Sequence, residues 1–534
     1  MKEFDYIVVG GGAGGCAVAG RLSEDPAVSV CLLEAGKGDD QLLIKVPFCT
    51  AVMLPTTLNN WAFETVPQPG LNGRRGYMPR GKALGGSTSI NAMVYTRGHP
   101  WDYDHWAALG NEGWSWREVL PYFKRSEHNE AFSGEYHAQG GPLNVANLRS
   151  HNPFQEIYLE AARQTGFRLI EDFNGADQDG IGIYQVMQKD GERWNAARAY
   201  LGPHLASRPN LTVMTQVRAR RIVLSGRRAN GIEFQQGREL QTFTARREVI
   251  LTAGAIQSPQ LLMLSGVGAG AELQGVGIPV VHDLPGVGKN LQDHPDYVFN
   301  YRARSLDLLG ISLGGSVQMV REILRYRRER TGMMSSNGAE GGGFLRRFPD
   351  SPAPEFQLHF VVGMIDSHAR KLHMGHGYSC HVCLLRPKSI GTLALADADP
   401  LAAPRIDPNF FGDPDDLEAM VDGFKLTRKL MDAPILAGIR TGEVYTERIH
   451  SDDAIREELR NRADTIYHPV GTCRMGSDAM AVVDSRLRVR GLEGLRVVDA
   501  SIMPTLIGGN TTAPTLMIGE KGADMIRADA RGEA

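Results

Sequence analysis

The sequence predicts an α/β fold with two domains, one of which is discontinuous and built from both ends of the chain. Three observations predict this fold. The N-terminal segment reads as strand, glycine-rich turn, helix and strand, which is typical of a parallel sheet. The central segment contains strands in which polar and apolar residues alternate, as in an antiparallel sheet. The C-terminal segment returns to a buried strand followed by a helix.

The first element is a strand over residues 4–9, which is apolar and β-branched like the strands of a parallel sheet. It leads directly into Gly10, Gly12 and Gly15, which fit the pattern G-x-G-x-x-G. In a dinucleotide site the first glycine allows a tight turn and the second lets the backbone approach a pyrophosphate. The third glycine lets the following helix pack closely on the strand.

A helix over 16–22 and a second strand over 28–33, which ends on Glu34, complete this unit. The N-terminus of the helix would offer free N–H groups to phosphates, and Glu34 would accept a hydrogen bond from a ribose hydroxyl. The alternative is a glycine-rich turn in an unrelated α/β protein. The full order of strand, turn, helix, strand and acid favours a Rossmann-like dinucleotide-binding domain.

Composition limits the class of protein. A chain of 534 residues is too long for one ordinary core, so two or more folding units are expected. The net charge of −3 and the lack of a basic tail give no support for nucleic acid as a partner, and we expect none. No apolar run approaches the ~20 residues of a membrane-spanning helix, and the N-terminus leads straight into a strand rather than a signal peptide. We therefore expect a cytoplasmic protein.

The six cysteines are few for this length, which agrees with a reducing compartment. Only Cys380 and Cys383 have the C-x-x-C spacing of a metal site. They fall in an expected strand, where residues three apart face opposite sides, and no second ligand pair lies nearby. The sequence therefore predicts no metal site.

Two stretches before residue 100 bear on a ligand. Residues 35–80 are rich in loops and form either a lid over a cofactor or a surface excursion. Residues 81–95 combine glycines and hydroxyls just before an apolar run. Such a backbone can pass close to a planar ligand or a phosphate, although a helix start capped by Ser or Thr has the same composition.

The rest of the chain is assigned from periodicity. Helices are predicted over 116–123, 153–165, 258–264, 317–330, 417–431 and 515–526, with Pro514 in the first turn of the last. Strands are predicted over 211–215, 221–224, 231–234, 240–244, 247–251, 355–360, 378–384, 391–395 and 495–499. The strands between 355 and 395 predict an antiparallel sheet with one covered face.

These elements predict the extent of the two domains. The dinucleotide-binding domain is expected to comprise residues 1–155, 195–300 and 461–534. The substrate domain is expected to comprise 156–194 and 301–460, with an antiparallel sheet flanked by helices. No internal repeat is evident, and the sequence predicts no oligomeric state.

Four motifs in order resemble the glucose–methanol–choline (GMC) family of flavin oxidoreductases over essentially the full length. They lie at residues 81–104, 254–268, 468–476 and 499–501. The Arg97-Gly98-His99 run and residues 467–471 are most similar to the bacterial alcohol dehydrogenases of the choline dehydrogenase-like branch. Those enzymes act on primary alcohols, aliphatic or polyether, and on choline.

The resemblance implies an FAD cofactor held in the Rossmann-like unit. Asn91, Ala92, Met93 and Val94 would line the flavin, and a backbone contact to adenine would fall near Ala219. Asp499 and Ala500 would meet the pyrophosphate and ribityl region, and Asn510 and Thr511 would lie near the ring. The implied cofactor-binding residues are Gly10, Gly12, Gly15, Glu34, Gly86, Asn91, Ala92, Met93, Val94, Ala219, Asp499, Ala500, Asn510 and Thr511. Ile90 stands where some members attach FAD covalently through histidine, so noncovalent FAD is expected.

The implied chemistry moves a hydride from carbon to flavin N5 and a proton from oxygen to a base near neutral pKa. His468 matches the base of the family, and Asn510 matches its second catalytic position. The expected activity is oxidation of a primary alcohol to the aldehyde, with electrons passed to a quinone or another non-oxygen acceptor. The alternatives are an alcohol oxidase that uses oxygen, a choline dehydrogenase, and, in a different class, a non-redox lyase with structural FAD. Lyases of this fold pair two histidines, and Asn510 argues against them.

Residues 317–330 form an amphipathic pattern that contains five arginines. One interpretation is a solvated helix face on the substrate domain, which the sequence favours. The other is contact with an anionic membrane surface, where a quinone or respiratory acceptor would collect electrons. The second interpretation would place the protein at the periphery of the inner membrane.

Overall fold

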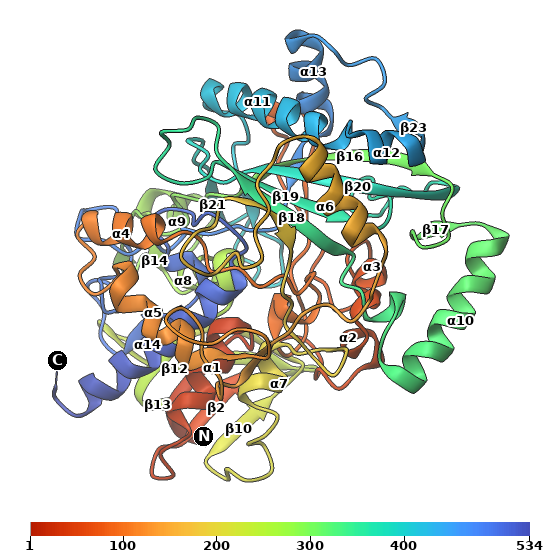
Figure 1. Ribbon diagram of the computed structural model, residues 1–534. Helices are drawn as coiled ribbons and strands as arrows, with labels where there is room; N and C mark the ends of the chain where they lie inside the picture. The colour runs from red at the N-terminus through yellow and green to blue at the C-terminus, as the bar shows by residue number, and fades with distance from the viewer. Residues whose placement is uncertain (1, 534) are drawn as a thin grey trace.

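The computed structural model describes residues 2–533 and contains two large sheets, one in each half of the molecule (Figure 1). The first sheet has the strand order β10-β2-β1-β13-β12-β11, and β25 pairs with β13. The pairs β10–β2, β2–β1, β1–β13 and β13–β25 are parallel, whereas β12 pairs antiparallel with β13 and with β11. Its strands are β1 (Lys2–Val9), β2 (Val30–Leu33), β10 (Leu211–Met214), β11 (Val217–Ser225), β12 (Arg228–Gln236), β13 (Glu239–Leu251) and β25 (Leu495–Val497).

Strand β13 corrects the sequence prediction, because the expected strands 240–244 and 247–251 are one continuous strand. Its first half pairs antiparallel with β12, and its second half pairs parallel with β1. The sequence prediction ended one strand at residue 244 and began the next at 247, which put Arg246 in the gap and Arg247 at the start of the second strand. Both instead approach the carboxylate of Asp5 on β1, at 2.9 Å for Arg246 and 3.5 Å for Arg247, so they remain within the strand.

Helices from both ends of the chain pack together beside this sheet. α1 (Ala13–Leu22) lies against α14 (Thr512–Ala530), whose Gly519 has no room for a side chain because a Cβ there would come within 2.7 Å of Ala17. α8 (Gly254–Leu264) follows β13, and α5 (Trp116–Ser126) lies on α14. α14 begins three residues before the predicted start, and Pro514 does occupy its first turn. The two ends of the chain therefore contribute to one core.

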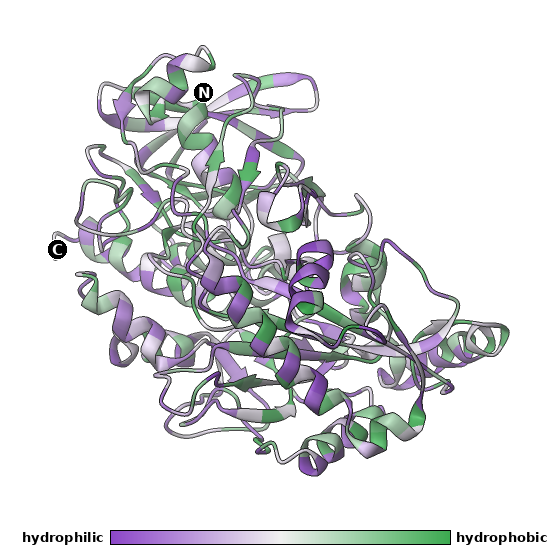
Figure 2. Cartoon of the chain, turned by 90° about the horizontal axis from the view of Figure 1, so that it is seen from above, coloured by the Kyte–Doolittle hydropathy of each residue, from purple (hydrophilic) through white to green (hydrophobic). Residues whose placement is uncertain are grey.

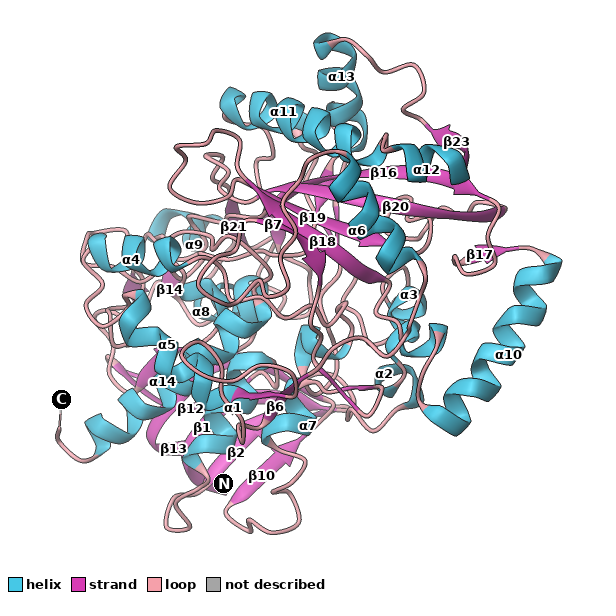
Figure 3. Cartoon of the chain, viewed as in Figure 1, coloured by secondary structure: helices cyan, strands magenta, loops and turns pink. Residues whose placement is uncertain are grey.

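The second sheet is antiparallel and has the order β23-β16-β20-β19-β18-β7. Helices α6 (Phe154–Gln164), α11 (Pro414–Met431) and α13 (Asp452–Arg462) cover its outer side (Figure 3). The predicted boundary at residue 300 falls within a strand of this sheet, and the other domain boundaries stay a prediction. Its strands are β7 (Gly180–Ile183), β16 (Pro295–Ala303), β18 (Ala339–Leu345), β19 (Phe356–Val361), β20 (Gly375–Leu384) and β23 (Arg440–Val444), with β17 (Gly310–Ile311) and β24 (Asp464–Thr465) at the side.

The expectation that only one face of this sheet is covered is wrong. Every residue of β18 and β19 is buried. Phe356, Leu358 and Phe360 pack in the core beneath the helices. Gln357 and His359 point to the other side, where they meet Asn510 from the C-terminal segment. The inner face of the second sheet therefore forms one wall of a buried site and is not exposed to solvent.

The strand predicted over 391–395 forms but does not join the large sheet. It is β21 (Thr392–Ala394) and pairs with β22 (Arg405–Asp407) in a sheet of two strands. Leu393 and Ile406 lie in the core of the first sheet, which explains the different pairing. The two cysteines of the C-x-x-C run lie in separate cores, Cys380 beneath the helices and Cys383 on the inner side.

The remaining elements are short apart from α10 (Leu313–Glu329), which begins four residues before its predicted start. Residues 35–80, which the sequence left as a lid or a surface excursion, contain two short helices, and part of this stretch walls an internal cavity. The short elements are α2 (Leu42–Lys45), α3 (Thr50–Met53), α4 (Pro100–Ala108), α7 (Ala196–Tyr200), α9 (Gly270–Gly275), α12 (Pro434–Ile439), β3 (Phe63–Glu64), β4 (Tyr77–Met78), β5 (Glu127–Asn129), β6 (Leu143–Val145), β8 (Gln188–Lys189), β9 (Glu192–Arg193), β14 (Val267–Gly268) and β15 (His282–Asp283).

Candidate active site

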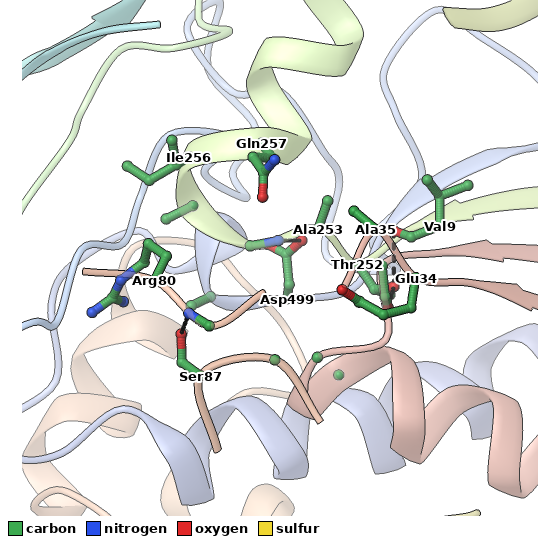
Figure 4. A pocket seen from close by; sticks show the side chains of 18 of the residues that line it. Val9, Glu34, Ala35, Arg80, Ser87, Thr252, Ala253, Ile256, Gln257 and Asp499 are labelled. Carbon is green, nitrogen blue, oxygen red and sulfur yellow. Dashed lines mark hydrogen bonds between the residues drawn. The ribbon is translucent and has the colours of Figure 1, made fainter. Parts of the chain in front are cut away.

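A cleft opens at the carboxyl ends of β1, β2 and β13, where Val9, Leu33 and Thr252 lie in its wall. Ligands of open α/β sheets bind at this edge because the loops that leave the strands diverge there. Figure 4 shows Glu34 and Asp499 at the wall of the cleft, in the segments that follow β2 and β25. Predicted residues on its lining are Gly10, Gly12, Glu34, Gly86, Ala219, Asp499, Ala500 and Thr511.

The three motif glycines have different surroundings. Gly10 has φ +111°, and a Cβ there would meet the Thr252 carbonyl at 2.6 Å. Gly15 lies behind the cleft wall, where a Cβ would meet the Gly10 carbonyl at 2.0 Å. Gly12 has no neighbour nearer than 3.7 Å to such a Cβ and lies on the cleft surface. The motif therefore needs glycine at 10 and 15 for the fold, whereas Gly12 leaves space for a ligand.

Glu34 lies at the end of β2 and organises the loops around it. Its two carboxylate oxygens accept hydrogen bonds from the N–H groups of Gly11 at 2.8 Å and Gly36 at 2.7 Å. Burial raises the pKa of Glu34 to about 7, against the opposing effect of these donors. Each oxygen keeps a further lone pair, so the carboxylate can accept from a ligand hydroxyl on the cleft side.

Three helices point their N-termini at the cleft. The residues before α1 and α14, Gly12 and Thr511, make no side-chain capping bond. The first N–H of α8, at Gly254, donates to Asp499 at 2.9 Å, and Asp499 also accepts from Ser258 at 2.6 Å. The N–H groups at the starts of α1 and α14 are thus left for a ligand, and their dipoles favour negative charge.

A second cavity adjoins the cleft, and Arg80, Ser87, Thr511 and Thr512 line both. Its wall is mostly apolar and runs beneath the inner face of the second sheet. The predicted residues Asn91, Ala92, Met93, Val94, His468 and Asn510 all line it, together with Ile90. The structure thus brings the predicted residues together around two joined spaces.

His468 lines the second cavity and is bonded through both ring nitrogens. Its Nδ1 lies 2.9 Å from Nδ1 of His294, and its Nε2 lies 3.2 Å from Nδ2 of Asn510. Its backbone N–H donates to Asp293 at 2.8 Å. The other nitrogen of His294, Nε2, lies 3.1 Å from the carbonyl of Leu385.

These contacts determine where the ring hydrogens are. The Leu385 carbonyl can only accept, so Nε2 of His294 carries the hydrogen of that ring. A neutral imidazole has one N–H, so Nδ1 of His294 accepts and Nδ1 of His468 donates. Nε2 of His468 is therefore the unprotonated nitrogen, and it faces the cavity beside the Asn510 amide.

The Asn510 amide is oriented by two donors. Its Oδ1 accepts from the Thr96 hydroxyl at 3.1 Å and from Nε2 of Gln357 at 2.9 Å. Its Nδ2 is left to point at Nε2 of His468 and at Nε2 of His359, which is 3.5 Å away. A ligand oxygen at this point would meet one N–H donor and one unprotonated imidazole nitrogen.

Family models described as GMC oxidoreductase match residues 4–296 and 387–519. The chain belongs to the GMC oxidoreductase family. It is 46% identical to an alcohol dehydrogenase (acceptor) of Pseudomonas putida, over 98% of this chain and 95% of that protein. It is 42% identical to human mitochondrial choline dehydrogenase, over 98% and 90%. The crystal structure of pyridoxine 4-oxidase from Mesorbium loti is similar with a TM-score of 0.88 and 31% identity, over 98% of each chain.

This GMC oxidoreductase is a flavoenzyme with FAD as its cofactor, so the predictions of fold class, family, enzyme and cofactor are confirmed. The residues present fit that cofactor. The cleft offers two uncapped helix N-termini for phosphates, an acid at the end of β2 and a close approach at Gly86, where a Cβ would come within 2.7 Å of Gly12. Which residue contacts which part of FAD stays a prediction.

Three histidines in the site of this GMC oxidoreductase, His294, His359 and His468, have lowered pKa values that favour the neutral form. Burial is the largest cause that keeps the pKa of His468 well below its usual range, followed by the charges that His294, His359 and Arg80 would place beside it. Burial also lowers the pKa of His294 and of His359 to about 3. The sequence led us to expect a base with a pKa near neutral, and burial instead lowers the pKa of His468 because it penalises the charged ring. A neutral imidazole is the form that can take up a proton.

Sequence reasoning missed the residues that orient His468 and Asn510. Two of them, Gln357 and His359, lie in the strand predicted over 355–360, and their spacing of two places them on one face. That spacing was a usable signal for a shared site. His294 lies in a loop after residue 286 that carries no such pattern, and only its contact with His468 reveals its role.

Proposed function

We propose that this GMC oxidoreductase is an FAD-dependent alcohol dehydrogenase that oxidises a primary alcohol to the aldehyde. In this proposal His468 is the base and Asn510 holds the substrate oxygen. One observation carries the proposal. The unprotonated Nε2 of His468 and the N–H of Asn510 face the same point in the lining of a mostly apolar cavity that joins the cofactor cleft.

Bound FAD supplies the acceptor for the two electrons and the hydrogen that leave the substrate carbon as hydride. The chain supplies the rest. The substrate O–H donates its proton to Nε2 of His468, and the C–O bond becomes a double bond as the carbon loses hydride. Asn510 donates to the substrate oxygen and stays neutral, so it does not compete for the proton. His294 keeps Nδ1 of His468 as the donating nitrogen throughout.

The lining of the second cavity supports an uncharged alcohol. The lining includes Leu54, Val94, Leu309, Val361 and Ile466. None of the described residues that line this cavity is an aspartate or a glutamate. A quaternary ammonium group is normally held by carboxylates or by a cage of aromatic rings. The similarity to human choline dehydrogenase keeps choline as a second candidate, and the apolar lining favours an aliphatic alcohol.

We also propose a quinone or another non-oxygen acceptor for the electrons, and noncovalent attachment of FAD. The relative at 46% identity is an alcohol dehydrogenase (acceptor), which supports the first. Ile90 supports the second, because its side chain is buried among Ile44, Met53 and Ala83 and offers no nucleophile. Release of free flavin into the supernatant after acid precipitation of the protein is the expected result for noncovalent FAD.

The experiment that tests the activity is anaerobic reduction of the flavin by a panel of primary alcohols. The panel contains straight-chain alcohols of increasing length, a polyether alcohol and choline. We expect bleaching of the flavin absorbance by straight-chain alcohols, followed by fast reoxidation with a soluble quinone and slow reoxidation with air. Fast reoxidation by air would indicate an oxidase. A flavin that no alcohol bleaches, with release of an aldehyde, would indicate the lyase.

A further inference from the structure

Helix α10 exposes a stripe of apolar side chains. Leu313, Val317, Val320 and Leu324 recur at spacings of four, three and four, which places them on one face of the helix. Leu313 is 91% exposed, and the other three are each about half exposed. Figure 1 shows α10 at the edge of the molecule, and Figure 2 shows hydrophobic positions recurring along this edge.

The opposite face of α10 holds the helix to the protein, so the stripe points outward. Glu322 and Tyr326 are its buried residues. Glu322 accepts from the N–H of Met333 at 2.7 Å, and the Tyr326 hydroxyl donates to the carbonyl of Gly191 at 3.1 Å. The carboxylate and the phenol, which a solvated helix would expose, therefore face inward, and the leucines and valines face out.

Arginines border the stripe on both sides. Arg321, Arg327 and Arg328 form no ion pair or hydrogen bond with any residue in the range 2–533, whereas Arg325 lies 3.5 Å from Glu329. At 100° per residue, Arg327 and Arg328 lie on either side of Leu324. Long arginine side chains can keep their charge at a polar level while their methylene groups lie along apolar surface.

Two neighbouring segments extend the apolar stripe at the N-terminal end of α10. Leu306 lies beside Gly314, and Ile311 bridges to Met374 in the loop before β20. Leu372 and Met374 in that loop are 74% and 68% exposed. We call this set of residues the α10 surface; it comprises Leu306, Ile311, Leu313, Val317, Val320, Ile323, Leu324, Leu372 and Met374, with Arg321, Arg327 and Arg328 at its border.

We propose that the α10 surface docks on an anionic lipid bilayer. Contiguous exposed apolar patches with a charged border are typical of interaction sites. A bilayer interface matches both the apolar stripe and the arginine border of the α10 surface. Acyl chains would contact the apolar side chains, and anionic headgroups would pair with the unpaired arginines. A second copy of the chain would cover the leucines, but the outward stripe carries no carboxylate to meet the arginines. Within residues 2–533 no helix has the length and apolar character to cross a bilayer, so the contact would be interfacial.

The docked face adjoins the wall of the second cavity. Leu309 follows Leu306 in the chain and lines that cavity, and its N–H donates to the carbonyl of Val362 at 2.7 Å. Ile365 and Ala369, from the loop that carries Leu372, also line it. Docking would therefore bring lipid next to the segments that wall the cavity, where apolar alcohols and quinones are most concentrated. The docking itself does not depend on the proposed acceptor.

Vesicle co-sedimentation of the FAD-loaded enzyme tests this inference. The vesicles contain either phosphatidylcholine alone or an equal mixture with phosphatidylglycerol. We expect binding to the anionic vesicles that weakens as salt is raised, and much weaker binding to the neutral ones. The double variant V320D/L324D should lose binding to both. The triple variant R321Q/R327Q/R328Q should lose on the order of a hundredfold in affinity for anionic vesicles, as expected for three charges.

Matched controls separate docking from damage to the fold and from the proposed activity. L240D changes a leucine that is also about half exposed, on β13 and far from α10 in the fold, and should bind like the parent. All variants should keep their flavin spectrum and their alcohol oxidation with a soluble acceptor. Equal sedimentation of parent and α10 variants would overturn the inference. Self-association of the parent without lipid, abolished in V320D/L324D, would also overturn it in favour of a second copy as the occupant.

Discussion

The Nδ1 atoms of His294 and His468 lie 2.9 Å apart, and the Leu385 carbonyl determines which of them carries the hydrogen. His294 is thus a positioning residue for the proposed base. We expect H294L to lower the rate constant of anaerobic flavin reduction by about a hundredfold, at the low end of what a general base contributes. H294N offers an amide oxygen to the same N–H and should restore most of the rate.

The readout that separates this role from a structural one is the comparison between the two variants. Both lose the bond to Leu385, and only H294N can accept from Nδ1 of His468. Stopped-flow reduction at equal flavin content is the measurement. Equal rates for H294L and H294N would contradict the tautomer assignment, even if His468 proves to be the base.

Replacing the proposed base itself should have a larger effect. In H468A the substrate proton has no acceptor, so flavin reduction should slow by roughly 10²–10⁴-fold while FAD content stays close to that of the parent. The measurement is the same stopped-flow reduction, with flavin content taken from the absorbance spectrum. Q235A, a change on β12 outside both cavities, is a matched control and should leave the rate unaltered. An unchanged rate in H468A would remove His468 from this role.

The pH dependence of the reaction follows from the lowered pKa of His468. The active form is neutral, and a base with a lowered pKa stays neutral until the pH falls through that value. The rate constant of flavin reduction should therefore be flat around neutral pH and decline only well below pH 6.5. A decline centred at or above pH 6.5 would show that the pKa is not lowered. Stopped-flow reduction over a pH series is the measurement.

His359 should make a pH-dependent contribution to stability. Its pKa is about 3 when folded, against the ordinary 6.5 when unfolded, so the unfolded chain binds more protons below pH 6.5. Its contribution is full above pH 6.5 and is lost as the pH falls toward 3, by up to about 1.4 kcal/mol per pH unit. The apparent Tm of H359Q relative to the parent should therefore rise between pH 7 and pH 5.

The difference between parent and variant is the informative quantity for His359. Burial raises the pKa of Glu34 and of Asp293 to about 7. The contribution of such an acid to the free energy of unfolding falls as the pH rises from about 4 to 7, because the unfolded chain releases the proton first. The pH dependence of these two acids is opposite in sign to that of the buried histidines. It is the same in the parent and in H359Q, so it cancels when the two Tm values are subtracted. A Tm gap that does not change with pH would contradict the buried, neutral state of His359.

Glu34 should matter for retention of FAD. In E34Q one of the two backbone donors, Gly11 or Gly36, faces an amide NH₂ group instead of an acceptor. The change also removes the carboxylate that would accept from a ribose hydroxyl; a hydrogen bond to a charged group is worth about 1.5–3 kcal/mol, so the Kd for FAD should rise on the order of tenfold to a hundredfold. Titration of the apoprotein with FAD by flavin fluorescence measures it. E239Q, on the exposed start of β13, should bind FAD like the parent.

Local patterns in the sequence predicted much of this protein. The strand, the glycines and the helix predicted over residues 4–22 are all present, with β1 starting at Lys2 and α1 at Ala13, three residues before the predicted helix. The residues that the family resemblance indicated, from Asn91 to Asn510, do line two joined cavities. Short motifs state their own requirements, because glycine and apolar β-branched residues at fixed spacings are recognisable without the distant partners, such as Thr252 beside Gly10, that the folded chain supplies.

Contacts between distant segments decided the rest. The break expected inside β13 disappears because Asp5, more than 200 residues away, approaches the two arginines. The hydrogen on His468 is placed by His294, which is 174 residues earlier, and the outward direction of α10 is determined by burial of Glu322 and Tyr326. The sequence shows that such residues are polar or apolar, and the free energy of burying them depends on partners that only the folded chain brings together.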